Sequence, residues 1–161
     1  MALDRTDWGR LIGCLAVCYG AGGIGSAFTA PKIPTWYAAL EKPAFTPPDA
    51  VFMPVWLTLY GLMAVSVFLI WRKGLQTEGV KVPFILFWVQ LALNAMWSLV
   101  FFGGESIVGG FAIILALGVI LLITIIKSFK VSKTAGGLLI PYIVWIGIAT
   151  ALNAGIMTLN T

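Results

Sequence analysis

The chain has 161 residues, of which 60% are hydrophobic and only 10% are charged. A water-soluble domain of this size cannot bury so much apolar surface, so the composition predicts an all-α membrane protein, with residues 1–161 as one domain. The net charge of +4 comes from short basic connections between apolar runs, which indicates topology signals and not nucleic-acid binding. The chain has no His, the commonest metal and haem ligand, and we expect no metal site.

A membrane-spanning helix needs about 20 mostly apolar residues. Five segments meet this requirement, so we predict a five-helix transmembrane bundle with its two termini on opposite sides. The predicted spans are residues 11–30, 50–71, 83–102, 107–126 and 135–158.

Lys and Arg divide unequally between the two sides of this bundle. The side with the amino terminus has eight of them: Arg5, Arg10, Arg72, Lys73, Lys81, Lys127, Lys130 and Lys133. The other side has Lys32 and Lys42. By the positive-inside rule, we expect a multi-pass protein of a prokaryotic cell membrane, with a cytoplasmic amino terminus and an outside carboxyl terminus.

The first span is rich in small residues, with glycines gathered between residues 20 and 25 that permit close approach of another helix. Cys14 and Cys18 are four residues apart in this span. Helix geometry makes a disulfide between them unfavourable, so we expect two buried thiols.

The connection after the first span is broken by prolines, which remove amide donors and prevent one regular helix. We expect Thr35 to cap a single helical turn that ends at Pro43. The run Thr46-Pro47-Pro48-Asp49 has the form of a capping box with prolines in the first turn, and it predicts the start of the second helix.

On that second helix, Trp56 and Tyr60 are separated by four residues and share a face with Phe52 and Met63. Two interpretations are open from the residues alone. The aromatic face is either part of a ligand site or a set of interfacial anchors, for which Trp and Tyr are typical at membrane boundaries.

The third and fifth spans carry amides among their apolar residues. Gln90, Asn94 and Trp97 lie on one face of the third, and this face is expected to point into protein because amides in hydrocarbon need partners. The alternative to a ligand contact is a hydrogen bond between helices. In the fifth span, Pro141 predicts a kink, and Tyr142 begins a face shared with Trp145, Ala149 and Asn153.

The predicted spans lack the residue types that most catalytic and ion-transport mechanisms need. They carry no charged residue near their centres, which disfavours pumps, proton relays and voltage sensors, and the chain shows no nucleophile–base pair. Aromatic and amide residues suit a flat, apolar ligand with a few polar edges. The candidate lining comprises Tyr37, Trp56, Asn94, Trp97 and Trp145.

Two motifs carry a resemblance to a known family. The run W-Y-x-x-L-x-K-P-x-x-x-P-P at residues 36–48, followed by V-F-x-P-V-W-x-x-L-Y at residues 51–60, resembles the TspO/MBR family. These are the tryptophan-rich sensory proteins and the translocator protein, or peripheral benzodiazepine receptor. Matching positions continue in the third and fifth spans, so the resemblance covers nearly the whole chain.

The resemblance implies a five-helix bundle, often a homodimer, that binds porphyrins and isoquinoline or benzodiazepine drugs in tetrapyrrole handling or stress signalling. No resident cofactor is implied; protoporphyrin is the expected ligand, beside membrane lipid. The residues implied in the ligand cavity and its lid are Tyr37, Pro47, Pro48, Trp56, Asn94, Trp97, Trp145 and Ala149. Two rival functions stay open: light-dependent degradation of protoporphyrin, with Trp56 and Trp145 as catalytic candidates, and transport of tetrapyrroles or lipids.

One departure from the family concerns sterols. The animal sterol-recognition stretch has an aromatic residue followed by a basic one near the end of the fifth helix. Residues 152–161 contain no Tyr, Lys or Arg, so cholesterol recognition is not carried over to this chain.

Overall fold

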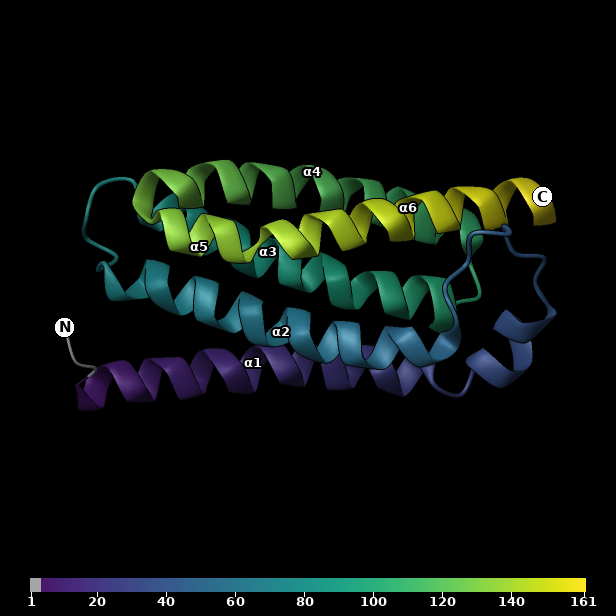
Figure 1. The fold of residues 1–161 in the computed structure, drawn as a ribbon, viewed down its shortest axis with the longest axis horizontal. Helices are drawn as coiled ribbons and strands as arrows, with labels where there is room; N and C mark the ends of the chain where they lie inside the picture. The colour runs from purple at the N-terminus through teal and green to yellow at the C-terminus, as the bar shows by residue number, and fades with distance from the viewer. Residues whose placement is uncertain (1–3) are drawn as a thin grey trace.

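In the computed structural model, which describes residues 4–161, long helices lie side by side in an elongated bundle with loops at both ends (Figure 1). The elements are α1 (Arg5–Thr29), the π-helical turn η1 (Ile33–Tyr37), α2 (Asp49–Arg72), α3 (Lys81–Ser98), the π-helical turn η2 (Leu99–Gly103), α4 (Ile107–Val131), α5 (Lys133–Leu138) and α6 (Ile140–Asn160). Within residues 4–161, five stretches are long and apolar enough to cross a membrane when η2 is counted with α3 and α5 with α6. This confirms the predicted all-α, five-span fold.

The first and fourth helices are longer than the hydropathy pattern predicts. α1 begins at Arg5, six residues before the predicted start, because the Asp4 carboxylate accepts a hydrogen bond from the Asp7 backbone N–H at 2.7 Å. α4 continues to Val131, past the predicted end at residue 126. The hydropathy pattern detects only the apolar part of a helix. It therefore misses first and last turns that contain polar residues, as in α1 and α4.

Two predicted caps around the proline-rich connection are wrong. Thr35 lies inside η1, and its hydroxyl donates to the carbonyl of Pro31 at 3.0 Å. The Thr46 hydroxyl donates to the carbonyl of Pro43 at 2.7 Å. α2 begins at Asp49, and Pro48 at its N-cap position makes no capping hydrogen bond through its side chain. Because both hydroxyls bond to carbonyls behind them, they stabilise turns of the connection instead of helix starts.

The fifth span breaks near Pro141, as its position predicts. α5 ends at Leu138 and α6 begins at Ile140, so Pro141 lies in the first turn of a new helix, where it needs no amide donor. The short α5 is attached to α2 through the buried Ser66 hydroxyl, which donates to the carbonyl of Ala135 at 2.8 Å. The break lets the last span approach α2 at one end and diverge from it at the other.

Helix pairing leaves one seam open. α3 packs on α4, α1 on α2 and α4 on α6, whereas the backbones of α2 and α6 lie farther apart and meet through side chains such as Phe52 and Trp145. On the closed side, α1 comes so near α2 that a Cβ atom added at Gly22 would lie 2.6 Å from the Tyr60 ring. Cys14 and Cys18 are buried free thiols in this interface, as expected.

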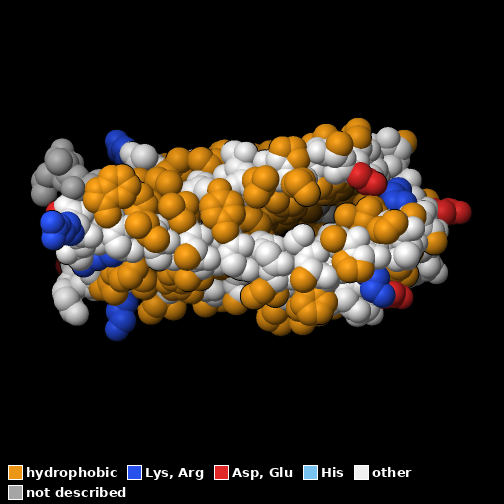
Figure 2. All heavy atoms as spheres, turned by 90° about the horizontal axis from the view of Figure 1, so that it is seen from below, with side chains coloured by type: hydrophobic (Ala, Val, Ile, Leu, Met, Phe, Trp, Pro, Cys, Tyr) orange, Lys and Arg blue, Asp and Glu red, His pale blue; other side chains and the backbone are white. Residues whose placement is uncertain are grey.

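The outer surface has the distribution of a membrane protein. One face is largely hydrophobic along its length, with Lys and Arg mainly at the end where α1 begins and Asp and Glu mainly at the opposite end (Figure 2). The same view shows a hollow in the half of this face nearer the acidic end. A continuous apolar band between two charged ends is what a bilayer requires of its protein surface.

Candidate functional site

Three helices meet at Asn94. The Tyr60 hydroxyl of α2 donates to Asn94 Oδ1 at 2.7 Å, and Asn94 Nδ2 donates to the Tyr142 hydroxyl of α6 at 3.0 Å. All three side chains are buried. The hydrogen bond between helices, which was the alternative to a ligand contact for this face of α3, is therefore present. The Asn94 amide still has one N–H and one oxygen lone pair that these two bonds do not use.

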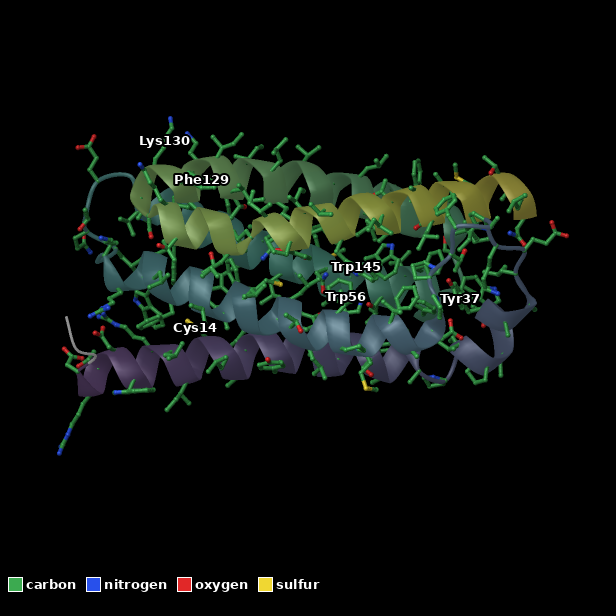
Figure 3. All side chains as sticks on the ribbon, in the orientation of Figure 1. Cys14, Tyr37, Trp56, Phe129, Lys130 and Trp145 are labelled. Carbon is green, nitrogen blue, oxygen red and sulfur yellow. The ribbon has the colours of Figure 1, made fainter. Side chains whose placement is uncertain are left out.

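Aromatic rings surround this polar centre. Trp56 stacks on Tyr60, with ring centroids 5.4 Å apart and planes 28° apart, and meets the edge of Tyr142 at 6.2 Å. Trp145 meets the edge of Phe52 at 5.6 Å. Figure 3 shows Trp56 on α2 and Trp145 on α6 in the same part of the bundle. We call this set the inner aromatic site: Phe52, Trp56, Tyr60, Asn94, Tyr142 and Trp145.

A groove of about 370 Å³ runs along the open seam between α2 and α6. Its walls are almost entirely apolar, and the one hydroxyl among them, that of Thr58, is bonded to the carbonyl of Pro54 at 2.9 Å. The lining residues are Pro54, Val55, Thr58, Leu59, Leu62, Pro141, Val144, Trp145 and Ile148. Trp145 belongs to both the groove and the inner aromatic site, so the groove adjoins that site.

A second aromatic group closes the end of the bundle below the proline-rich connection. Trp97 stacks on Phe101 at 5.2 Å, and Tyr37 packs on Phe102 at 5.5 Å. We call this group the outer aromatic cluster: Trp36, Tyr37, Trp97, Phe101 and Phe102. The turn η2, with its wider π-helical spacing, brings both phenylalanines to the same side as Trp97.

Tyr37 lies under the connection in a protected environment. It is only 7% exposed, and the Lys42 ammonium lies 4.8 Å from the centre of its ring. Burial raises the pKa of the Tyr37 hydroxyl, and the negative charge of Asp49 raises it further. The hydroxyl is therefore a neutral hydrogen-bond donor throughout the physiological range.

The connection itself, residues 31–48, is fastened at several points. Lys32 forms an ion pair with Glu105 at 2.5 Å. The Asn160 side chain accepts from the backbone N–H of Glu41 at 3.0 Å and donates to its carbonyl at 2.9 Å. Pro43 packs so closely on α6 that a Cβ atom added at Gly155 would lie 2.3 Å from it. The connection thus forms a lid over the outer aromatic cluster.

The predicted site residues fall into two groups. Trp56, Asn94 and Trp145 come together in the inner aromatic site, whereas Tyr37 and Trp97 lie in the outer cluster. Trp97 packs against the buried residues of both groups, and its indole N–H donates to Asn153 Oδ1 of α6 at 3.3 Å. Three predicted residues remain: Pro47 and Ala149 are half-buried and Pro48 is exposed. Pro47 and Pro48 precede α2, and Ala149 lies one turn after Trp145.

Sequence reasoning did not place Tyr60 and Tyr142 among the site residues, although their hydroxyls hold Asn94. A usable signal was present, because Tyr60 follows Trp56 by four residues and Tyr142 precedes Trp145 by three. A hydroxyl-bearing ring at such a spacing lies beside the indole on the same helix face. Sequence reasoning did not take into account that the buried Asn94 amide needs hydrogen-bond partners from other helices, which Tyr60 and Tyr142 provide.

This fold and this interior define an integral membrane protein of the five-helix class, with an aromatic and amide-lined centre. The model of the TspO/MBR family matches residues 14–159. The chain is 40% identical over 152 residues to the tryptophan-rich protein TspO of Archaeoglobus fulgidus, covering 94% of this chain and 97% of that protein.

Two further relatives widen the comparison. Identity is 37% over 131 residues to the translocator protein of Homo sapiens, covering 81% of this chain and 78% of that protein. Identity is 33% over 154 residues to the tryptophan-rich sensory protein of Cereibacter sphaeroides, covering 96% of this chain and 93% of that protein. The chain belongs to the TspO/MBR family.

Proposed function

We propose that this protein binds porphyrins, and isoquinoline- or benzodiazepine-type drugs, at the inner aromatic site and acts in tetrapyrrole handling or stress signalling. The observation that carries the proposal is the Tyr60–Asn94–Tyr142 network beside two indoles and an apolar groove. Stacking on Trp56 and Trp145 suits a flat ring system, and the remaining hydrogen-bonding capacity of Asn94 suits one polar edge.

Position in the membrane supports the same proposal. The groove opens between two helices long and apolar enough to cross a membrane, so a ligand dissolved in the bilayer would meet Trp145 without crossing the lid. Its volume of about 370 Å³ lies within the usual range for small-molecule sites.

The direct test is a titration of the purified protein with protoporphyrin, first in darkness and then under illumination. Saturable quenching of tryptophan fluorescence in darkness, without a new absorbing product under light, supports binding as the function. Absence of saturable binding contradicts the proposal. The same preparation in sealed vesicles tests the transporter rival, which requires porphyrin or lipid flux across the bilayer.

A second candidate function, light-dependent porphyrin degradation, is favoured by one specific observation. Two indoles, Trp56 and Trp145, come from different helices into one aromatic site. An excited porphyrin held against an indole can oxidise it. The illuminated titration distinguishes this candidate, because it requires a new absorbing product that forms only when porphyrin, light and protein are together.

Orientation and assembly are part of the proposal. We place the amino terminus in the cytoplasm and the carboxyl terminus outside, because of the eight-to-two distribution of Lys and Arg. A reporter fused after Thr161 is then active only if it works outside the cell. We also propose a homodimer, because α1 exposes Gly9, Gly13 and Gly20 with open space around them. Cross-linking in native membranes tests this assembly.

A further inference from the structure

A second cavity lies at the end of the bundle opposite the lid. It has a volume of about 410 Å³, and residues from the end of α2 and from the start of the last span line it. The lining residues are Leu69, Arg72, Lys73, Ser132 and Thr134. Arg72 is sixteen residues from Trp56 along α2, about 24 Å, so this cavity is separate from the inner aromatic site.

Every polar side chain in this cavity carries a hydrogen-bond donor. Arg72 and Lys73 bring cationic groups, and Ser132 and Thr134 bring hydroxyls. The Ser132 oxygen accepts the backbone N–H of Ala135 at 3.2 Å, which leaves its own O–H able to donate toward the cavity. Several donors with positive charge around one space favour an anion with several oxygen atoms.

The guanidinium of Arg72 is held in position by a neighbour outside the cavity lining. Its Nε donates to the Asp7 carboxylate at 3.0 Å, and the Arg72 side chain remains 27% exposed. The pair joins the start of α1 to the end of α2, and it also offsets part of the positive charge. Lys73 is exposed, so this ammonium contributes the main uncompensated charge of the lining.

Charge across the whole molecule favours an anion at this end. Eight Lys and Arg residues lie here against three acidic residues, Asp4, Asp7 and Glu78, whereas the lid end has two basic residues against three acidic ones. The view in Figure 2 shows the same contrast between the two ends. Clefts with basic residues on the positive side of a membrane protein are suited to acidic lipid headgroups.

An apolar wall distinguishes a lipid from a free anion. Leu69 lines the cavity, and Leu62, seven residues earlier on α2, lines the apolar groove of the open seam. The distance between them along the helix is about 10 Å. Between the two leucines Ser66 is fully buried and bonded to α5, so the apolar surface beside the cleft is Leu69, on which the hydrocarbon chain of a molecule with its phosphate at Lys73 can begin.

We propose that this cavity, the basic cleft, binds the phosphate headgroup of an acidic phospholipid. Lys73 and Arg72 face the phosphate charge, the hydroxyls of Ser132 and Thr134 donate to its oxygens, and the acyl chain begins on Leu69. The basic cleft is separate from the inner aromatic site, so this proposal does not depend on porphyrin binding. The lipid that it would bind comes from the bilayer and has a structural or regulatory role.

Native mass spectrometry of the purified full-length protein in a neutral detergent tests the proposal. The probes are phosphatidylglycerol and phosphatidylcholine with identical acyl chains. We expect one phosphatidylglycerol to bind at least about fivefold more tightly than phosphatidylcholine, the effect of roughly one effective cation near a headgroup. Lys73→Gln is expected to abolish most of this preference, and Thr134→Val to weaken it about threefold without changing net charge.

Lys130→Gln is the matched control. It removes the same charge from the same end, but Lys130 lies on α4 outside the cleft (Figure 3). We expect this variant to bind phosphatidylglycerol like the parent, and both lysine variants to keep the parental thermal midpoint because both side chains are exposed. Equal binding of the two lipids, equal losses in the two lysine variants, or full displacement by inorganic phosphate would overturn the proposal.

Discussion

The inner aromatic site and the outer aromatic cluster use similar residues in different ways. In the inner site, Asn94 is bonded to tyrosines from two other helices, so the positions of the rings depend on directional bonds in a low-dielectric interior. In the outer cluster, rings pack on rings and the lid covers them, with one hydrogen bond from Trp97 to Asn153. We propose that the inner site determines ligand affinity, whereas the outer cluster holds the lid on the bundle.

The largest expected effect tests this assignment by deleting one indole from each region. Trp145→Ala is expected to weaken porphyrin binding by about 30-fold, near 2 kcal/mol, because a buried aromatic anchor is lost. Trp36→Ala, in the outer cluster, is expected to change affinity by less than about threefold. Fluorescence titrations of both variants in darkness measure this. If both variants bind equally well, the inner site is not the ligand cavity.

The next prediction separates stacking from photochemistry within the inner site. Trp56→Phe and Trp145→Phe keep a stacking ring but lose the readily oxidised indole, so dark affinity is expected to stay within roughly tenfold, about 1.4 kcal/mol. Light-driven loss of porphyrin, followed by absorbance with and without oxygen, is expected to fall to a small fraction of the parental rate. Trp36→Phe is the control. Parental rates in both inner variants would remove the degradation candidate and leave binding.

A third prediction concerns polar groups on the same face of α3. Gln90 is 0% exposed, and among residues 4–161 neither of its amide atoms has a hydrogen-bond partner. Gln90→Leu is therefore expected to stabilise the protein by about 1 kcal/mol, since a buried unpaired amide is costly. Asn94→Leu is expected to do the opposite, because it leaves two tyrosine hydroxyls without their amide partner. Thermal unfolding in detergent compares them, and a lower midpoint for Gln90→Leu would contradict this.

The smallest expected effect concerns the lid. Asn160→Ala removes both side-chain bonds to Glu41, so amide hydrogen exchange in residues 38–46 is expected to accelerate by about fivefold, near 1 kcal/mol, while dark affinity for porphyrin is unchanged. Thr158→Ala is the control, because that hydroxyl donates within α6 to Gly155. A large loss of affinity in Asn160→Ala would show that the lid, and not the inner site, determines binding.

Most of the fold could be predicted from the sequence because bilayer thickness and backbone hydrogen bonding leave few alternatives for long apolar runs. Features within one helical turn were also predictable, such as the stacking of Trp56 on Tyr60 and the break near Pro141. The predicted helix caps at Thr35 and Thr46 are wrong, although they too depend only on nearby residues. A threonine hydroxyl can donate backward to a carbonyl as readily as it can accept from an amide ahead.

What the sequence determined by itself is the set of spans and the face on which each aromatic residue lies, since both follow from interactions over about four residues. The tertiary structure decided which faces meet. The partners of Asn94 are 34 and 48 residues away in the chain, and the division of Tyr37 and Trp56 into different regions follows from the path of the lid. Such pairings depend on how helices pack and which seam stays open, and helical periodicity carries no information about either.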